Sequence, residues 1–145
     1  MTMVVFHLGV PDKLLYVCRL LRKASRQGAR VRVVADEVEC AQLDSALWTF
    51  EPSEFLPHAR YDPAKVPHPS WSHTPIWLTQ KDHEWPDVVP PASVLVNLDR
   101  EGLSQVNAFD RVIEVVSLED DDKEAARHRW RRYKALGLDC QHHQV

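Results

Sequence analysis

The chain has 145 residues and a mass of 16.7 kDa, the size of one ordinary domain that buries a core without disulfides or metals. Its formal net charge of -3 and its isoelectric point near 6.2 exclude a protein that binds nucleic acid through a strongly basic overall charge. No apolar run is long enough to cross a bilayer, which excludes a protein with membrane-spanning helices.

The N-terminus and the cysteines both indicate a cytoplasmic location. The first residues carry no cationic leader and no small-residue cleavage site, so they are not typical of a secretion signal. Cys18, Cys40 and Cys140 are scattered, odd in number and without a C-x-x-C pair. We therefore expect free thiols in a reducing compartment.

The first third of the chain predicts a β-α-β-α order. Short apolar, β-branched runs predict strands, and apolar residues at helical spacing predict helices. Gly28 stands where a helix C-cap glycine belongs, and Asp36 followed by Glu39 resembles a capping box. The predicted elements are a strand at 3–9, a helix at 11–28, a strand at 30–35 and a helix at 37–48.

The remainder of the chain starts with an irregular segment, residues 49–91, which is rich in proline, histidine and tryptophan. It ends with a helix whose acidic start and basic end suit the helix dipole. The predicted elements here are a strand at 75–79, strands at 93–98 and 111–116, a short helix or loop at 99–109, and the final helix at 118–137.

Strands that alternate with helices predict a three-layer α/β/α fold. We expect a mostly parallel sheet of about five strands with helices on both faces. Residues 1–145 show no internal repeat and no low-complexity linker, so we expect a single domain. Such a sheet is Rossmann-like, and the question is whether it carries a nucleotide site.

The motifs of nucleotide binding and catalysis are missing. The turn after the first strand, "HLGVPDK", has one glycine where a dinucleotide fingerprint needs three, and the chain contains neither a phosphate-binding loop nor a nucleophile elbow. The eight histidines match no metal-ligand spacing, and Cys18 and Cys40 lie on apolar helix faces. We therefore expect no catalytic residue, no cofactor and no metal site.

A basic stretch in the final helix, "KEAARHRWRRYK", carries the strongest functional signal. At about 100° per residue, four cations fall within one quadrant of the helix: Lys123, Arg127, Arg131 and Lys134. Ala126, Trp130 and Tyr133 line the adjoining quadrant, which places aromatic surface beside the cations. One interpretation is an anion-binding stripe, and the other is a solvated basic face with Trp130 and Tyr133 in the core.

Large aromatic residues gather where the second helix ends. Trp48 and Phe50 precede Pro52, which prevents the helix from continuing, and Phe55 follows shortly afterwards. Trp and Phe are usually buried, so core packing is one interpretation. The alternative is that some of these rings form the wall of a surface groove.

These stretches resemble the chi subunit of bacterial DNA polymerase III, an accessory subunit of the clamp-loader assembly. The block "RQGARVRVVADEVECAQLDSALWTFEPSEFLPH" is similar to the family's most recognisable segment, an "LDxxLWxF…FxPH" pattern. The later stretches "VLVNL", "FDRVIEVV" and "ARHRWRRYKALG" are similar to its last strands and terminal helix. The resemblance covers nearly the whole chain and is weakest at residues 59–92.

The resemblance implies a binding role without catalysis. Chi subunits bind the acidic C-terminal tail of single-stranded DNA-binding protein and attach to the clamp loader through the small psi subunit. It implies that the four stripe cations hold the tail's carboxylates, and that one groove also offers an apolar socket formed by Trp48, Phe55 and Val116, with Trp130 at its border. DNA would then be contacted only indirectly or weakly.

Two other classes of function stay open from the residues alone. One is an enzyme that handles nucleotides or hydrolyses a substrate on the same sheet, which the missing phosphate loop and nucleophile elbow disfavour. The other is direct nucleic-acid binding through the basic helix, which the acidic run Glu119–Asp122 and the acidic overall charge disfavour.

Overall fold

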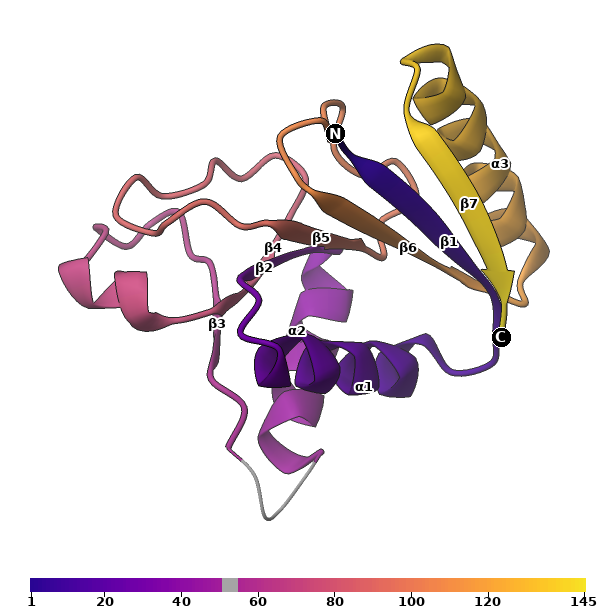
Figure 1. Cartoon of the computed structure of the whole chain (residues 1–145). Helices are drawn as coiled ribbons and strands as arrows, with labels where there is room; N and C mark the ends of the chain where they lie inside the picture. The colour runs from indigo at the N-terminus through magenta and orange to yellow at the C-terminus, as the bar shows by residue number, and fades with distance from the viewer. Residues whose placement is uncertain (51–54) are drawn as a thin grey trace.

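The computed structural model describes residues 1–50 and 55–145. The strands are β1 (Met3–Val10), β2 (Val31–Val34), β3 (His58–Arg60), β4 (Ile76–Thr79), β5 (Val94–Asn97), β6 (Arg111–Ser117) and β7 (Asp139–Gln144). The helices are α1 (Lys13–Arg26), α2 (Glu37–Thr49), the short 3-10 helix η1 (Pro69–His73) and α3 (Asp120–Ala135). In this described part of the chain the seven strands form one sheet in the order β3-β4-β2-β5-β6-β1-β7, with all neighbours parallel (Figure 1).

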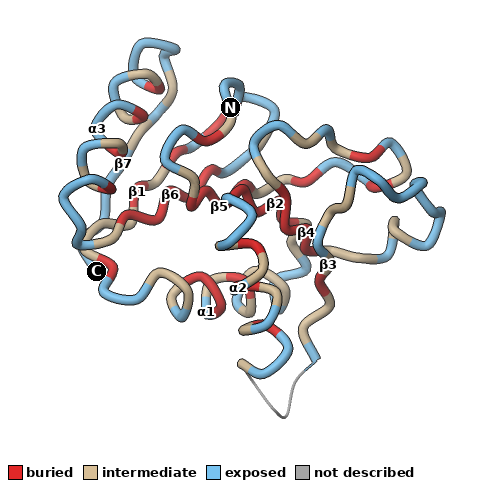
Figure 2. The backbone as a smooth tube through the Cα atoms, turned by 180° about the vertical axis from the view of Figure 1, so that it is seen from behind, coloured by how far each residue is buried: buried red, intermediate tan, exposed pale blue. Residues whose placement is uncertain are grey.

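Helices cover both faces of this sheet, which confirms the predicted three-layer α/β fold. Helices α1 and α2 lie on one face and α3 lies on the other (Figures 1 and 2). Successive residues of a strand point to opposite faces, so Val33 packs in the core under α1 and α2 while Val34 packs in the core on the α3 side. Burial on both faces explains why these strands are continuously apolar.

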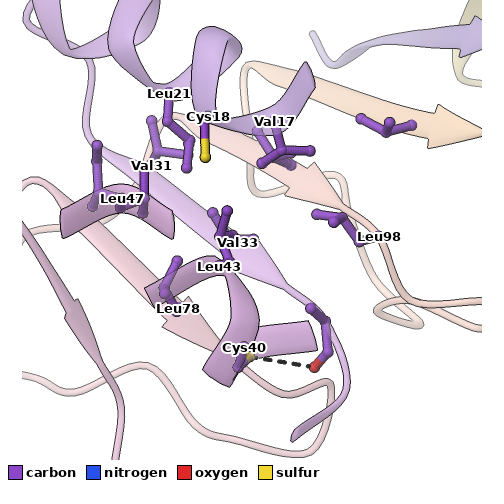
Figure 3. Close-up of a cluster of buried hydrophobic side chains, with 14 of the residues drawn as sticks. Val17, Cys18, Leu21, Val31, Val33, Cys40, Leu43, Leu47, Leu78 and Leu98 are labelled. Atoms are coloured by element: carbon purple, nitrogen blue, oxygen red, sulfur yellow. Dashed lines mark hydrogen bonds between the residues drawn. The ribbon is translucent and has the colours of Figure 1, made fainter. Parts of the chain in front are cut away.

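The core under α1 and α2 holds two of the three free cysteines (Figure 3). Burial raises the pKa of both Cys18 and Cys40 to about 11. The Cys40 thiol also donates a hydrogen bond to the carbonyl of Ala35, with the sulfur 3.7 Å from the oxygen. Their interpretation as small core residues is therefore confirmed.

Local capping places the helix starts. The carboxylate of Asp12 accepts a hydrogen bond from the backbone N–H of Leu15 at 3.1 Å, and Asp36 forms the predicted capping box with Glu39. Helix α1 ends before Gly28, whose φ of +75° is the left-handed conformation expected just beyond a helix C-terminus. Pro52, which the sequence indicates as the reason that α2 ends, lies outside the described residues.

Two strands at the sheet edges extend it beyond the predicted number of about five. Strand β3 has three residues, too few to give a periodic signal. Strand β7 has the polar sequence "DCQHHQ" and is mostly exposed, so it lacks the apolar run by which the other strands were predicted. The segment 99–109 is a loop, which is one of the two forms expected for it.

The described residues include no helix that is both long and apolar enough to cross a membrane.

Candidate partner-binding surfaces

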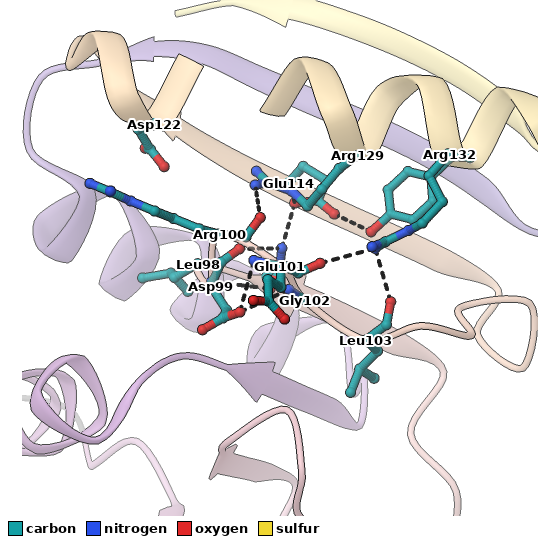
Figure 4. A network of polar contacts seen from close by, with 12 residues as sticks. Leu98, Asp99, Arg100, Glu101, Gly102, Leu103, Glu114, Asp122, Arg129 and Arg132 are labelled. Carbon is teal, nitrogen blue, oxygen red and sulfur yellow. Dashed lines mark hydrogen bonds and ion pairs between the residues drawn. The ribbon is translucent and has the colours of Figure 1, made fainter. Parts of the chain in front are cut away.

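A buried polar network fixes α3 on the sheet (Figure 4). Glu114 of β6 is 0% exposed and accepts hydrogen bonds from Asn97 Nδ2 at 2.7 Å, Arg129 Nε at 3.0 Å and the Tyr133 hydroxyl at 2.5 Å. Burial, followed by the charge of Glu114, raises the pKa of Tyr133, so its hydroxyl stays protonated and donates. The network holds the helix in one rotation about its axis.

The first turn of α3 is fixed at a second point. Asp122 is buried and accepts hydrogen bonds from the backbone N–H of Ser117 at 2.8 Å and from Lys13 Nζ at 3.1 Å. Burial alone would raise the pKa of Asp122, but the bonds from Ser117 and Lys13 outweigh it and the pKa is lowered. The carboxylate therefore stays charged and links the start of α3 to the start of α1.

These contacts divide the cations of the basic stretch into two groups. Arg129 and Arg132 stabilise the fold, because Arg129 pairs with Glu114 and Arg132 Nη2 donates to the carbonyls of Glu101 and Leu103 at 3.0 and 3.1 Å (Figure 4). Lys123, Arg127 and Arg131 point to the other side of the helix.

Those three cations line a groove of about 490 Å³, which we call the α3 groove. Its lining residues come from α3, from the end of β6 and the residue after it, and from β1 and β7: Phe6, Leu8, Gly9, Val116, Leu118, Lys123, Ala126, Arg127, Trp130, Arg131, His142 and Gln144. None of these lining residues is acidic. The α3 groove therefore combines positive charge with apolar walls, as an anionic ligand that carries a hydrophobic group requires.

Trp130 is half-buried in the wall of the α3 groove. Its ring centroid lies 5.3 Å from that of Phe6 and 6.0 Å from that of His142, and Lys134 Nζ lies 5.9 Å from it. Tyr133 is fully buried in the core. Tyr133 is therefore a core residue, as the interpretation of a solvated basic face expects. Trp130 instead lies beside the cations at the groove, as the interpretation of an anion-binding stripe expects. Lys134 stands beside Trp130 rather than in the lining.

The exposed end of Arg127 is available for exchange with a ligand. Its Nη1 atom pairs with Glu124 Oε2 at 3.0 Å, and both side chains are more than half exposed. His128 contacts the other oxygen of Glu124 at 3.4 Å. An exposed pair of this kind contributes little stability, so a carboxylate from a ligand can replace Glu124 at small cost.

Trp48 and Phe55 lie on a different surface, which we call the α2-end surface. Trp48 is 57% exposed and Phe55 is 69% exposed, and their ring centroids are 5.6 Å apart. The ring of Trp48 also packs at a tilt against that of His58, with centroids 4.9 Å apart, and His58 Nε2 lies 3.0 Å from Asp44 Oδ1. His58 begins β3, at the edge of the sheet opposite to β7.

The structure therefore does not bring Trp48 and Phe55 to Val116 and Trp130. The sequence resemblance implied one groove with all four residues, but they are divided between two surfaces at opposite edges of the sheet. Val116 is buried below the α3 groove, whereas the aromatic pair projects from the α2-end surface. The expectation that these rings are core residues is wrong for Trp48 and Phe55, which are largely exposed.

Sequence reasoning missed the walls that β1 and β7 contribute. Phe6 and Leu8 carried no signal beyond that of a buried strand. His142 lies outside every element that the sequence predicts, because β7 was not predicted. Parallel pairing with β1 places His142 beside Phe6 on the side of the sheet that α3 covers.

A second cavity of about 670 Å³ occupies the position where doubly wound sheets bind nucleotides, at the carboxyl ends of the strands. The first residues of α1, α2 and α3 border it, and a helix N-terminus normally favours an anion. Here six carboxylates line it, Asp12, Asp36, Glu39, Asp99, Glu119 and Asp122, against two cations, Lys13 and Arg100. The excess of acidic over basic side chains disfavours a phosphate here. Among residues 1–50 and 55–145, no group of three metal-ligating side chains is arranged to hold an ion.

Comparison with known proteins identifies the family. The family model described as "DNA polymerase III chi subunit, HolC" matches residues 1–141. The chain is 33% identical over 141 residues to the DNA polymerase III subunit chi of Pseudomonas aeruginosa, covering 92% of this chain and 87% of that protein. It is 28% identical to the Haemophilus influenzae subunit and 27% identical to that of Escherichia coli, covering 83% and 84% of this chain and 78% of each relative. The chain therefore belongs to the family of DNA polymerase III chi subunits, which act in DNA replication.

Proposed function

We propose that this chi subunit binds the acidic C-terminal tail of single-stranded DNA-binding protein in the α3 groove, and that it links this protein to the clamp loader through the psi subunit. The role is one of tethering and requires no catalysis by this chain. One observation supports the proposal. The same groove is lined by apolar side chains and by three cations, Lys123, Arg127 and Arg131.

The chemistry of an acidic tail with a hydrophobic end suits both parts of the α3 groove. An arginine fork holds a carboxylate through two parallel hydrogen bonds, and the ammonium of Lys123 adds a point charge. The apolar end of the tail would pack against the accessible part of Trp130, whose ring rests on the buried side chain of Phe6. A short peptide in this groove contacts only a small area, so we expect weak binding that salt reduces. Weak binding suits a contact that forms and breaks repeatedly.

We assign the α2-end surface to the psi subunit. Trp48 and Phe55 form an exposed aromatic pair, and exposed aromatic residues are common at the centres of protein interfaces. The surface lies at the opposite edge of the sheet from β7, so a partner bound there leaves the α3 groove open. A tether between two proteins needs two such separate sites.

Direct binding of nucleic acid is a weaker alternative. The first turn of α3 carries Asp120 and Asp121 beside the cations, and both would repel phosphates. An enzymatic role is also weaker, because carboxylates outnumber cations in the cavity where this type of fold places a substrate phosphate.

The test is fluorescence anisotropy of a labelled acidic tail peptide from single-stranded DNA-binding protein, titrated with the chain at low and at high salt. We expect binding that weakens with salt and that Arg127→Ala reduces by about tenfold, because an ionic hydrogen-bonded contact is lost. Arg111→Ala removes an exposed arginine at the amino end of β6, away from the α3 groove, and should bind as the parent does.

Two further comparisons decide the outcome. A peptide with asparagine in place of each aspartate should lose most of its affinity, since the charge attraction is removed. Absence of binding by the parent chain at low salt would reject the proposed function, and equal binding by Arg127→Ala would place the tail outside the α3 groove.

A further inference from the structure

The C-terminal edge strand β7 brings two adjacent histidines to opposite faces of the sheet. His142 pairs in register with Phe6 and lines the α3 groove, with its ring 6.0 Å from that of Trp130. His143 pairs in register with His7 and its ring lies 5.6 Å from that side chain, on the face that α1 covers. Strand geometry thus makes one histidine part of the groove and excludes its neighbour.

The titratable groups that face His142 are basic or neutral. From α3 they are Lys123, Arg127, Arg131 and, beside Trp130, Lys134. From β7 itself, Cys140 packs on the same side, and burial raises the pKa of its thiol, which is therefore uncharged at neutral pH.

None of the other side chains that line the groove carries a negative charge. The β1 residues on this side, Phe6 and Leu8, are apolar. Glu114 lies beneath the helix in its ion pair with Arg129, and Glu124 on the outer side of α3 pairs with Arg127. A protonated His142 would therefore find its anionic partner in a bound ligand.

Imidazole is the side chain whose charge ordinarily changes between pH 5 and 8. A protonated ring at this place would add one more cation to the groove that holds the ligand's carboxylates. By linkage, if the protonated form binds the ligand more tightly, the bound ligand also favours protonation to the same extent. Binding an acidic peptide would then take up part of a proton.

We propose that His142 is a pH-dependent specificity residue of the α3 groove, which takes up a proton when an acidic, carboxylate-bearing peptide binds and so strengthens that binding as the pH falls. The inference rests on the proposed function, because it concerns the same groove and ligand. It adds a histidine from β7 to the arginines and lysine of α3, and it makes binding respond to pH near neutrality.

The test compares tail-peptide binding at about pH 6 and about pH 8, at constant ionic strength, in the full chain and in two variants. The parent chain should bind about two- to fivefold more tightly at the lower pH, a range that suits one added exposed charge pair. The carboxylates of the peptide stay ionised across this interval, and a label on its N-terminus removes the amine that would titrate.

His143→Gln is the matched control, since it removes the adjacent histidine on the opposite face and should keep the parent's ratio of affinities. His142→Gln should reduce that ratio to about one, whatever its affinity at the higher pH. Calorimetry of the parent in phosphate and in Tris buffer should show proton uptake on binding that His142→Gln lacks.

A third readout follows the ring directly. The NMR resonance of His142 should titrate with a midpoint that moves to higher pH when peptide is present, while that of His143 stays in place. Binding that is independent of pH in the parent, or a His142 midpoint that the peptide does not move, would overturn the inference and leave the proposed function standing. Absence of binding at both pH values would instead reject the proposed function.

Discussion

Burial separates two arginines of α3 that lie two positions apart. Arg129 is 2% exposed and its guanidinium contacts Glu114, which is 0% exposed, whereas Arg131 is exposed and lines the α3 groove. The same side-chain chemistry therefore has a structural role at one position and a proposed binding role at the other. The rotation of the helix about its axis decides which role each residue has.

Arg129→Ala should destabilise the chain by about 3–5 kcal/mol, because it leaves the carboxylate of Glu114 buried without its ionic partner. The measurement is the free energy of unfolding from urea denaturation. Arg131→Ala on the same helix should change that free energy by no more than about 0.5 kcal/mol, as is usual for an exposed position. Similar costs for the two variants would mean that the Glu114 network does not anchor α3.

The start of α2 contains a carboxyl group that makes the stability of the fold depend on pH. Glu39 is the third residue of the helix and completes the capping box with Asp36, whose carboxylate accepts a hydrogen bond from the Glu39 N–H at 2.8 Å. Burial raises the pKa of Glu39 to about 7, against the opposing attraction of Lys13. The folded state therefore holds a proton that the unfolded chain releases at lower pH.

The stability that this proton contributes should be present below pH 4.5, the ordinary value for the carboxyl, and be lost as the pH rises towards 7. Glu39→Gln keeps the capping geometry and cannot ionise. We expect it to stabilise the chain at about pH 8 by about 1–3 kcal/mol, since one pKa unit is about 1.4 kcal/mol and water still reaches the half-buried group.

Thermal unfolding of both proteins at about pH 5 and about pH 8 measures this effect. At the lower pH the difference between the two midpoints should be much smaller, because the glutamate is then mostly protonated in the folded state and only partly ionised in the unfolded one. A constant difference at both pH values would show that the substitution acts through packing.

The register of β1 with β6 shifts between His7 and Val10, where Gly9 has a φ of +70°. Gly9→Ala should destabilise the chain by about 1–2 kcal/mol, the ordinary cost of this backbone conformation for an L-residue. Its added Cβ would also lie 2.1 Å from Gln144 Nε2, so the end of that side chain must move.

Gly28→Ala is the matched control, because Gly28 has a φ of +75° and no atom within 4 Å of an added Cβ. The difference between the two variants in free energy of unfolding therefore reports the displacement of Gln144. A difference near zero would show that this side chain moves aside freely, and a large one would show that β7 depends on its position.

At the scale of the whole molecule, the sheet holds two surfaces apart. The α3 groove lies between α3 and the β1–β7 edge, and the α2-end surface lies beside β3 at the other edge. Strands β4, β2 and β5 lie between β3 and the strands that line the α3 groove, so ligands at both sites need not touch. This separation is what the proposed tether requires.

Combined substitution of Trp48→Ala and Phe55→Ala should change tail-peptide affinity by less than about twofold and abolish capture of the psi subunit, because it removes two exposed rings at the α2-end surface. Arg127→Ala should have the reverse pattern. Peptide anisotropy and co-purification with psi measure the two activities separately. Loss of tail binding in the aromatic variant would contradict this prediction and show that the two surfaces do not act independently.

The sequence by itself determined the parallel α/β fold, the inner strands and the cations of α3. Buried strands must be apolar on both faces, and a helix of known period orients Lys123, Arg127 and Arg131 together. These signals are local, since each depends on residues a few positions apart.

Only the tertiary structure decided what surrounds those cations and where the aromatic pair lies. Strand β7 is a polar edge strand without a periodic signal, so Phe6 and His142, from opposite ends of the chain, come together only through its pairing with β1. Trp48 is separated from Val116 because α2 and Val116 lie on opposite faces of the sheet, and because β4, β2 and β5 lie between β3, beside Trp48, and β6. Strand order follows from packing of the whole chain, which no local pattern encodes.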